Sequence, residues 1–398
     1  MLSSWIFNLI LAAGEVVLLR PLIVQRDAFS LRRLSLRLVG VALLAGLLAG
    51  LLGMDPFGML RLLAWAIFLH GTALAALAGW LLWYRSRLLA GACLAIAVIL
   101  PAIAFNAFRT EPYRLEVTTH RISAPGLTKP VTIVLIADLQ TDHLGDYERM
   151  ALIQAMELHP DLLLLAGDYV QLPPGAALEA TQRELNAYLK EIGFAAPLGI
   201  YAVEGNTDPP GWERAFEGLS VRTVRSTSTF DLGEIRLTAL SLAASFNQSL
   251  ALPPAPEEAF HIALGHGPDF ALSPDATVDL LLAGHIHGGQ VQIPGFGPLI
   301  TLSAVPQSWS TGRTELPTGG TLVVSRGIGM ERGRAPRLRF FCRPELVVLE
   351  LVPPPGASAQ HRSRQPGAAE LRERASPRRA LPKSRPVHSL PPTPPAGS

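Results

Sequence analysis

The stretch LLLAGHIHGGQ (residues 280–290) runs from four apolar residues into glycine, and two histidines one residue apart follow. A short apolar run bounded by glycine is typical of a strand buried in a sheet. Glycine allows the backbone to bend and to approach other groups closely, and imidazole is a common metal ligand. His285 and His287 lie on the same side if the chain stays extended, whereas a turn would aim them at two different ions. The stretch therefore indicates a strand that ends in a ligand site.

The sequence around this stretch repeats the same alternation of short apolar runs and glycine-rich loops. Two polar stretches, 147–159 and 177–193, have the composition and length of helices and lie between the apolar runs. We therefore predict an α/β domain over residues 109–352. Its predicted strands cover residues 131–137, 161–167, 198–205, 235–241, 260–267, 278–284 and 321–327.

Polar side chains follow several of these apolar runs, where strands of one sheet would bring them to the same edge. Carboxylate, amide and imidazole groups without a thiolate suit Mn²⁺, Fe or Zn²⁺, and the set is too rich in nitrogen for Ca²⁺. The sequence thus predicts a metal site at the strand ends. The candidate residues are Asp138, Asp168, Asn206, Asp208, His266, His285 and His287.

Residues 1–108 have a different composition. The chain is 49% hydrophobic and only 17% charged, which points to a membrane region. Four apolar segments each approach the ~20 residues that a spanning helix needs. Buried helices of a soluble domain are the alternative, but four nearly uncharged runs are hard to bury in one. The segments cover residues 5–24, 36–53, 62–83 and 88–108.

The arginines between these segments predict their orientation. Arg26, Arg32 and Arg33 separate the first two segments, and Arg85 and Arg87 separate the last two, whereas the middle connection has no basic residue. Basic loops stay in the cytoplasm. We therefore expect a multi-pass protein of the cell (inner) membrane whose α/β domain faces the periplasm or the exterior.

Glu15 is a carboxylate inside the first apolar segment. An ionisable group at such a place is a functional candidate, but Arg20 is close enough in sequence that we expect an ion pair at the interface. His70 is expected to be a packing or interface residue.

Residues 353–398 are rich in Pro, Ser, Ala and Arg. Such a composition cannot form a core, so we expect a disordered, solvated tail. The net charge of the whole chain is only +2, which gives no reason to expect a nucleic-acid partner.

The polar strand ends resemble those of the calcineurin-like metallophosphoesterases, whose signature is D-x-H, G-D, G-N-H-D/E, H and G-H-x-H. The resemblance covers about residues 130–350, and the later stretches GHIHGGQV, SRGIG and APRLRFFCRPEL resemble a bacterial, membrane-associated branch. The matching blocks are D138-L-Q140, G167-D168, G205-N206-T207-D208, H266-G-P-D269 and G284-H285-I-H287.

The resemblance implies a four-layer αββα sandwich that holds two divalent ions about 3.5 Å apart. Asp168 would bridge the two ions. A hydroxide shared between them would attack phosphorus. One ion would be held by Asp138, Gln140, Asp168 and His287, and the other by Asp168, Asn206, His266 and His285.

Two positions depart from the family pattern. Gln140 replaces a histidine ligand, so we expect weaker binding of the first ion. Thr207 replaces the catalytic histidine, which contributes about 10²–10⁴-fold in rate. The enzyme would then favour good leaving groups, or His143 or Asp208 would substitute, or the domain would bind without turnover. For His143, the sequence favours an exposed loop residue.

The sequence therefore predicts a membrane-anchored, metal-dependent phosphoesterase. Its substrate would be a phosphomonoester, phosphodiester or pyrophosphate of the envelope, lipid-linked because the anchor holds the site near the bilayer. Arg326 could bind the substrate phosphate or form an ordinary structural salt bridge. The alternative is a non-catalytic metal-binding sensor or receptor on a membrane anchor.

Overall fold

The computed structural model describes residues 2–24, 30–252, 259–274 and 278–354. Arg26 and residues 355–398, on which the predicted tail depends, lie outside the described residues.

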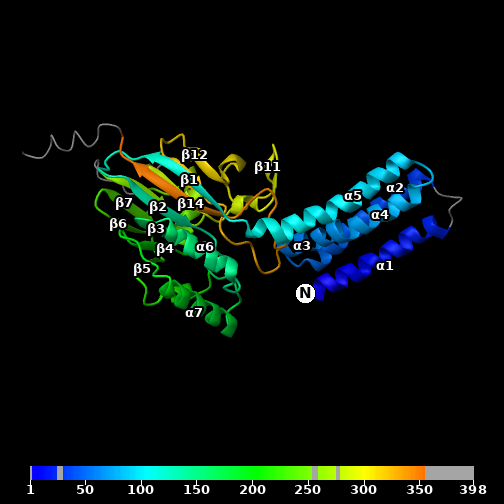
Figure 1. Cartoon of the computed structure of the whole chain (residues 1–398), viewed down its shortest axis with the longest axis horizontal. Helices are drawn as coiled ribbons and strands as arrows, with labels where there is room; N and C mark the ends of the chain where they lie inside the picture. The colour runs from blue at the N-terminus through cyan, green and yellow to red at the C-terminus, as the bar shows by residue number, and fades with distance from the viewer. Residues whose placement is uncertain (1, 25–29, 253–258, 275–277, 355–398) are drawn as a thin grey trace, which may run out of the picture. The chain divides into compact units, whose positions relative to one another are not determined.

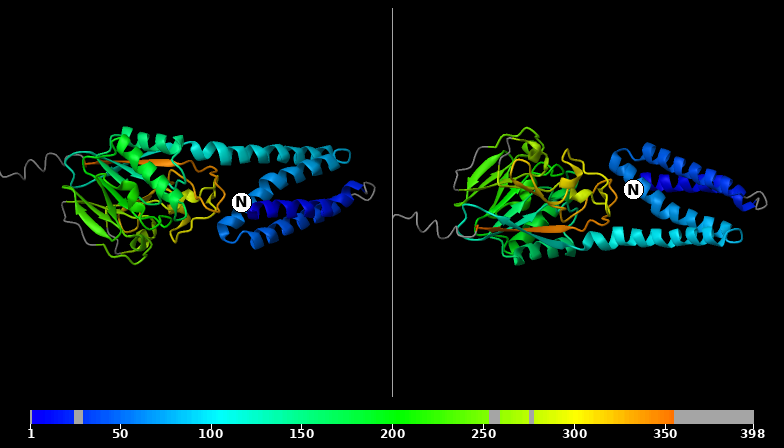
Figure 2. Two further views of the ribbon diagram at one scale, coloured as in Figure 1. Left: turned by 90° about the horizontal axis from the view of Figure 1, so that it is seen from below. Right: turned by 90° about the horizontal axis from the view of Figure 1, so that it is seen from above.

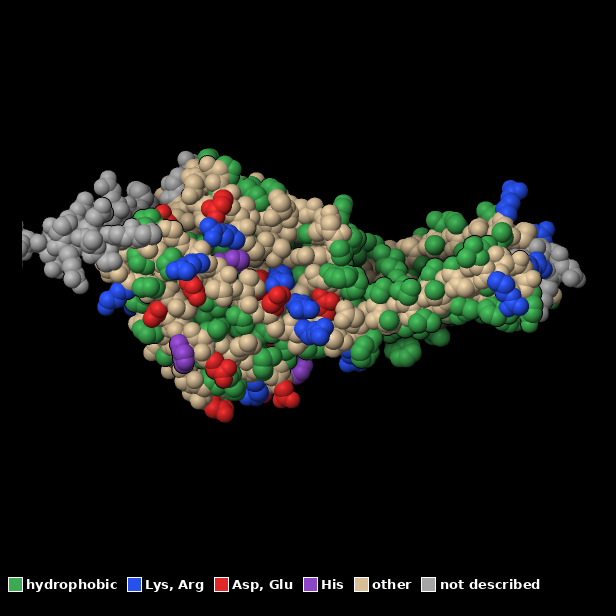
Figure 3. All heavy atoms as spheres, turned by 45° about the horizontal axis from the view of Figure 1, so that its top comes forward, with side chains coloured by type: hydrophobic (Ala, Val, Ile, Leu, Met, Phe, Trp, Pro, Cys, Tyr) green, Lys and Arg blue, Asp and Glu red, His purple; other side chains and the backbone are tan. Residues whose placement is uncertain are grey.

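Four helical segments at the start of the chain are long and apolar enough to cross a membrane. Consecutive segments run in opposite directions, so that the last residues of α1, the first residues of α2 and the α4–α5 connection lie at the same end (Figure 1). The Lys and Arg side chains visible on the helices in Figure 3 gather at one end, while hydrophobic side chains cover most of the rest. The segments are α1 (Leu2–Val24), α2 (Leu31–Leu52), α3 (Pro56–Trp65) continued by η2 (Ala66–His70) and α4 (Gly71–Leu82), and α5 (Arg87–Phe105) continued by η3 (Asn106–Thr110) and η4 (Glu111–Tyr113).

The expected Glu15–Arg20 pair is wrong. Glu15 Oε1 lies 3.0 Å from Nδ1 of His70, and Nε2 of His70 lies 3.0 Å from Oδ1 of Asn8. His70 ends the π-helical turn η2, where one extra residue per turn changes which side chains face the neighbouring helix. The three residues therefore form a polar triad between α1 and the third segment, 55 residues apart in sequence.

The α/β domain contains two six-stranded sheets, and all seven predicted strands are present. The first sheet has the order β1-β14-β2-β3-β4-β5, with β2 to β5 parallel and β14 antiparallel to β2. Its strands are β1 (Glu116–Ser123), β2 (Val131–Ile136), β3 (Leu162–Leu165), β4 (Ile200–Val203), β5 (Val221–Val224) and β14 (Glu345–Val352).

The second sheet has the order β12-β13-β9-β8-β7-β6, with β13, β9, β8 and β7 parallel. A separate hairpin pairs β10 (Gln292–Ile293) with β11 (Gly297–Pro298). The strands of the second sheet are β6 (Ser228–Asp231), β7 (Ile235–Ala239), β8 (Phe260–Leu264), β9 (Leu280–Ala283), β12 (Gly312–Glu315) and β13 (Thr321–Val324).

The sheets pack face to face on a core to which β2, β3, β7, β8 and β9 all contribute. Helices α6 (Asp146–Glu157) and α7 (Ala176–Glu191) cover the outer face of the first sheet (Figures 1 and 2). Both helices were predicted. The outer face of the second sheet is covered by short turns and loops, namely α8 (Leu242–Ser245), η6 (Asp269–Leu272), η8 (Gln307–Trp309) and the chain around them. The predicted α/β fold is confirmed, with two central sheets and with helices on the outer face of the first, whereas short turns and loops take the place of the expected outer helices on the second.

This topology places the polar residues together. The chain leaves β2, β3 and β4 of the first sheet and β8 and β9 of the second at their carboxyl ends, directly before the candidate ligands. Because each of these strands is four to six residues long and is buried, apart from the first two residues of β2, the ends are held at fixed positions between the two sheets.

Candidate metal centre

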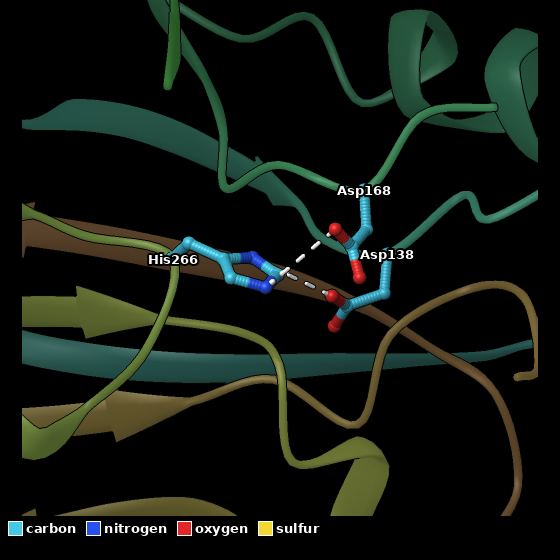
Figure 4. Close-up of side chains that lie close together, drawn as sticks. All are labelled: Asp138, Asp168 and His266. Atoms are coloured by element: carbon cyan, nitrogen blue, oxygen red, sulfur yellow. Dashed lines mark ion pairs between the residues drawn. The ribbon is translucent and has the colours of Figure 1, made fainter. Parts of the chain in front are cut away.

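Three buried side chains from both sheets converge at the strand ends. Asp138 follows β2, Asp168 follows β3 and His266 follows β8, and one ligand atom of each lies within 4.8 Å of the other two. Figure 4 shows the two carboxylates side by side with the imidazole facing them. The Oδ1 atom of Asp168 is 3.6 Å from Nε2 of His266, and Oδ1 of Asp138 is 3.9 Å from Nδ1.

The surroundings of His266 fix its tautomer, and therefore which ring nitrogen presents a lone pair to the cluster. Nδ1 lies 2.7 Å from the carbonyl oxygen of Ala166, which can only accept. Burial lowers the pKa of His266 to about 4, so the neutral ring donates from Nδ1 and exposes a lone pair on Nε2. That nitrogen lies 2.6 Å from Oδ1 of Asn206. A lone pair, an amide oxygen and the Asp168 carboxylate thus point at one place, an arrangement that a cation satisfies.

The two carboxylates are costly without a cation between them. Burial raises the pKa of Asp138, and the negative charge of Asp168 raises it further. Burial also raises the pKa of Asp168 to about 7, although the hydrogen bond from the Thr207 backbone N–H lowers it. Two neighbouring buried carboxylates repel one another unless a proton or a metal ion lies between them.

The backbone at the site is strained. A left-handed conformation is unfavourable for residues with a side chain, and such residues cluster where the structure holds them for a purpose. In the stretch 284–290, the turn also needs glycine, because a Cβ on Gly284 would lie 2.7 Å from Oδ2 of Asp138. Positive φ angles occur at Asp138 (49°), Gln140 (39°), Asp168 (57°), His285 (70°) and His287 (52°).

Gln140 lies beside Asp168, as its place in the motif predicted. Its amide nitrogen is 3.0 Å from Oε2 of Glu331 and 3.4 Å from Oδ2 of Asp168. Its amide oxygen is fully buried and has no hydrogen-bond partner among the described residues. A buried acceptor without a partner costs about 1–3 kcal/mol, and this oxygen is free to ligate an ion.

Glu331 was not recognised from the sequence. It accepts hydrogen bonds from the amides of Gln140 and of Gln171, the latter at 2.5 Å, and its charge raises the pKa of Asp168. The sequence feature that could have indicated Glu331 is its position in the strand-end loop SRGIGME, five residues after Arg326. Gln171 and Glu331 are 160 residues apart, so the contact itself was not visible in the sequence.

His285 contacts the cluster, whereas His287 lies beside Arg339. The backbone N–H of His285 donates to the Asp138 carboxylate at 3.0 Å, and its ring stacks edge-on at 5.0 Å from the ring of His266. The buried ring of His287 lies with Nδ1 3.5 Å from the guanidinium of Arg339. Burial, followed by the charge of Arg339, lowers the pKa of His287, and burial lowers that of His285 to about 4. Both rings are therefore neutral near pH 7, as metal ligands must be.

Thr207 and Asp208 organise Asp168 from the first sheet. The backbone N–H of Thr207 donates to Oδ1 of Asp168 at 2.8 Å. The Asp208 carboxylate accepts the backbone N–H groups of Asp168, Tyr169 and Gly205 at 2.8–2.9 Å. Three backbone donors occupy Asp208, which therefore holds the Asp168 loop in place.

Two predicted residues are not brought to the cluster. The His143 side chain is 71% exposed and pairs with Asp142. The Arg326 guanidinium lies 3.0 Å from both Glu116 and Glu345, which is the structural salt bridge that the sequence left open. The geometry gives neither residue a contact with Asp138, Asp168 or His266.

The residues present fit a divalent metal centre. Buried carboxylate and imidazole acceptors converge, and the amide oxygen of Gln140 beside them has no hydrogen-bond partner among the described residues. The donor set consists of carboxylate, amide and neutral imidazole, which suits Mn²⁺, Fe²⁺ or Zn²⁺.

Comparison with known proteins agrees with this chemistry. Residues 131–289 match the calcineurin-like phosphoesterase family. The chain is 30% identical over 263 residues to the uncharacterized metallophosphoesterase YkuE of Bacillus subtilis, a match that covers 61% of this chain and 87% of YkuE. It is 29% identical over 262 residues to the phosphodiesterase YaeI of Escherichia coli, covering 61% and 90% of the two proteins. The chain belongs to the calcineurin-like metallophosphoesterase family.

Proposed function

We propose that this protein is a membrane-anchored phosphoesterase that hydrolyses an envelope phosphoester or pyrophosphate with two divalent ions. The observation that carries the proposal is the convergence of the buried side chains of Asp138, Asp168 and His266, with the exposed Asn206 amide beside them, at the edge where both sheets end. Membership of the family gives the reaction class, which is hydrolysis at phosphorus.

Each side chain has a defined role in this proposal. Asp138, Gln140, Asp168 and His287 would hold one ion, and Asp168, Asn206, His266 and His285 the other. The ions, when bound, supply positive charge to the phosphoryl oxygens and lower the pKa of the attacking water. Asp208 keeps the Asp168 loop in place through three backbone N–H groups, and the Ala166 carbonyl fixes the tautomer of His266.

Thr207 limits the range of leaving groups. Its hydroxyl lies beside Asp168 and can donate one neutral hydrogen bond, but it cannot protonate an alkoxide near neutral pH. His143 is exposed and paired with Asp142, and Asp208 is occupied by backbone donors. We therefore favour substrates whose leaving group needs no acid, such as a pyrophosphate or an activated diester.

Two further features support an envelope location. Four helical segments have the length and composition of membrane spans, and Arg32, Arg33, Arg85 and Arg87 flank the two connections at one end of them. Because basic connections tend to remain in the cytoplasm, these arginines support a location of the α/β domain on the opposite side of the membrane.

A substrate comparison tests the proposal. Full-length protein in detergent, loaded with Mn²⁺, should hydrolyse a pyrophosphate or bis(p-nitrophenyl) phosphate faster than an alkyl phosphomonoester, whose leaving group needs a proton. No turnover of any of the three with a metal-loaded protein would favour the alternative, a metal-binding sensor or receptor domain.

A further inference from the structure

The α/β domain carries a concentrated set of exposed apolar side chains. Among the described residues from Tyr113 onward, nine large apolar side chains are exposed, and six of these belong to two short segments. The other three are Tyr113, Met150 and Ile153. We call the six residues the apolar hairpin surface; they are Ile293, Phe296, Leu299, Ile300, Leu302 and Phe341.

The two segments that form this surface are joined by backbone hydrogen bonds. Phe340 donates to the carbonyl of Gln290 and accepts from the N–H of Gln292, both at 2.9 Å. The segment of Phe341, which is 57% exposed, is therefore held against the chain that leads into the β10–β11 hairpin. Phe296, in the turn of this hairpin, is 64% exposed. The six side chains belong to one structural unit.

The same unit is attached to the end of the last candidate span. The Ala107 carbonyl, in the π-helical turn after α5, accepts the N–H of Arg339 at 2.9 Å. The carboxylate of Glu111 accepts the N–H of Cys342 at 2.5 Å. These two hydrogen bonds involve residues on either side of Phe341. The apolar hairpin surface therefore lies next to the C-terminal end of the candidate span Arg87–Tyr113.

The hairpin is also connected to the metal centre. The Leu302 carbonyl lies 3.3 Å from Nε2 of His285. A Cβ on Gly289 would lie 2.5 Å from the side chain of Pro298 in β11, so the hairpin packs closely on the stretch that carries both histidines. A displacement of the hairpin would therefore move the carbonyl that contacts His285.

We propose that the apolar hairpin surface inserts into the lipid monolayer that surrounds the chain's own helices and so opens the metal centre toward lipid-resident phosphoesters. Exposed apolar residues on a soluble domain mark a contact surface, and aromatic and aliphatic side chains at the headgroup boundary bind membranes. The lipid is the occupant because α5 itself ends at this surface. The insertion into lipid does not depend on the proposed phosphoesterase activity, whereas the delivery of substrate does.

Depth-dependent quenching tests the insertion independently of activity. The full chain, with Cys93→Ala, would carry the fluorophore NBD at Phe296→Cys and would be reconstituted as one copy per nanodisc. Doxyl-labelled lipid should quench the fluorescence of this probe strongly. It should quench a probe at the matched control position, Ile153→Cys on α6, much less. Equal quenching at the two positions would overturn the proposal, as would quenching of the probe at position 296 only in discs that hold two copies.

A pair of variants tests the delivery of substrate. Phe296→Ser combined with Leu299→Ser should lower kcat/KM about three- to tenfold for a lipid-anchored phosphodiester in vesicles. It should leave hydrolysis of soluble bis(p-nitrophenyl) phosphate unchanged, and the control pair Met150→Ser with Ile153→Ser should change neither rate. An equal loss on both substrates would overturn the delivery role. If the unmodified chain hydrolyses neither substrate, the proposed function fails and the quenching result alone decides the insertion.

Discussion

Two polar clusters among the described residues differ in how completely their hydrogen bonds are satisfied. In the helical region, both ring nitrogens of His70 have partners, Glu15 and Asn8, at 3.0 Å. At the strand ends, two carboxylates lie beside the lone pair of a neutral His266, and the Gln140 oxygen has no partner among the described residues. The first cluster closes on itself, whereas the second presents acceptors that need a cation.

The backbone makes the same distinction. Asp138, Gln140 and Asp168 all have positive φ angles, which cost of order 1–3 kcal/mol each, whereas Asn8, Glu15 and His70 lie within helical segments. A polar group that joins helices can be accommodated by regular structure. A ligand site needs side chains aimed at one point, and the chain adopts positive φ angles after β2, β3 and β9 to aim them.

Replacing the central carboxylate should have the largest effect. In Asp168→Ala, both proposed ions would lose a ligand, so we expect kcat/KM to fall about a thousandfold or more. Steady-state hydrolysis of bis(p-nitrophenyl) phosphate measures the change. His143→Ala is the matched control, since its ring is exposed, and it should leave the rate nearly unchanged. A residual rate within tenfold of the unsubstituted protein would contradict the central position of Asp168.

Restoring the missing acid should have the next largest effect. Thr207→His places an imidazole beside Asp168, and we expect turnover of an alkyl phosphomonoester to rise about 10–100-fold. Hydrolysis of a pyrophosphate should rise less, because its leaving group does not need the proton. An equal change for both substrates would show that residue 207 acts through the structure of the loop.

Acidity should weaken metal binding through Asp168. Its pKa in the metal-free protein is raised to about 7, so a proton competes with the metal as the pH falls through 7. The imidazoles of His266 and His285, with pKa values lowered to about 4, do not compete there. We expect the Mn²⁺ affinity to fall about tenfold per pH unit below 7, as measured by isothermal titration calorimetry.

The same shifts predict the stability of the metal-free chain. A folded-state pKa above the unfolded value means that Asp168 contributes stability at low pH that is lost as the pH rises through 7. His266 and His285 have lowered pKa values, so their contribution is present above 6.5 and is lost as the pH falls toward 4. Metal should therefore raise Tm more at pH 8 than at pH 6, and a pH-independent gain would contradict the assignment.

A substitution in the Asn8–Glu15–His70 triad should have the smallest effect. His70→Leu removes two hydrogen bonds between helices, which are worth about 1–2 kcal/mol in a membrane protein. We expect Tm in detergent to fall, while metal content and kcat/KM stay unchanged. Loss of activity with an intact fold would mean that the Asn8–Glu15–His70 triad takes part in function, and the contrast between the two clusters would fail.

Much of the site follows from the sequence because strand ends are local features. Asp138, Asp168, Asn206, His266 and His285 each follow a short apolar run, and parallel strands of this length bring such positions to one edge. Seven of the strands and the helices α6 and α7 follow from the same alternation, whereas the division into two sheets was implied by the family resemblance.

The remaining features depend on contacts between distant segments. Glu331 reaches Gln140 across 191 residues, and His70 reaches Glu15 because a π-helical turn changes the face of its helix. Arg326 follows a strand like the metal ligands, but Glu116 and Glu345 on β1 and β14 bind its guanidinium. Position at a strand end does not show whether a side chain already has a partner.

Metal content tests the central claim most directly. Full-length protein, purified in detergent and offered Mn²⁺, Fe²⁺ and Zn²⁺, would be analysed for bound metal beside Asp168→Ala and His70→Leu. We predict close to two equivalents per chain in the unsubstituted protein and in His70→Leu, and a large loss in Asp168→Ala. No bound metal in the folded, unsubstituted protein would contradict the account, because the converging acceptors at the strand ends would then bind no cation.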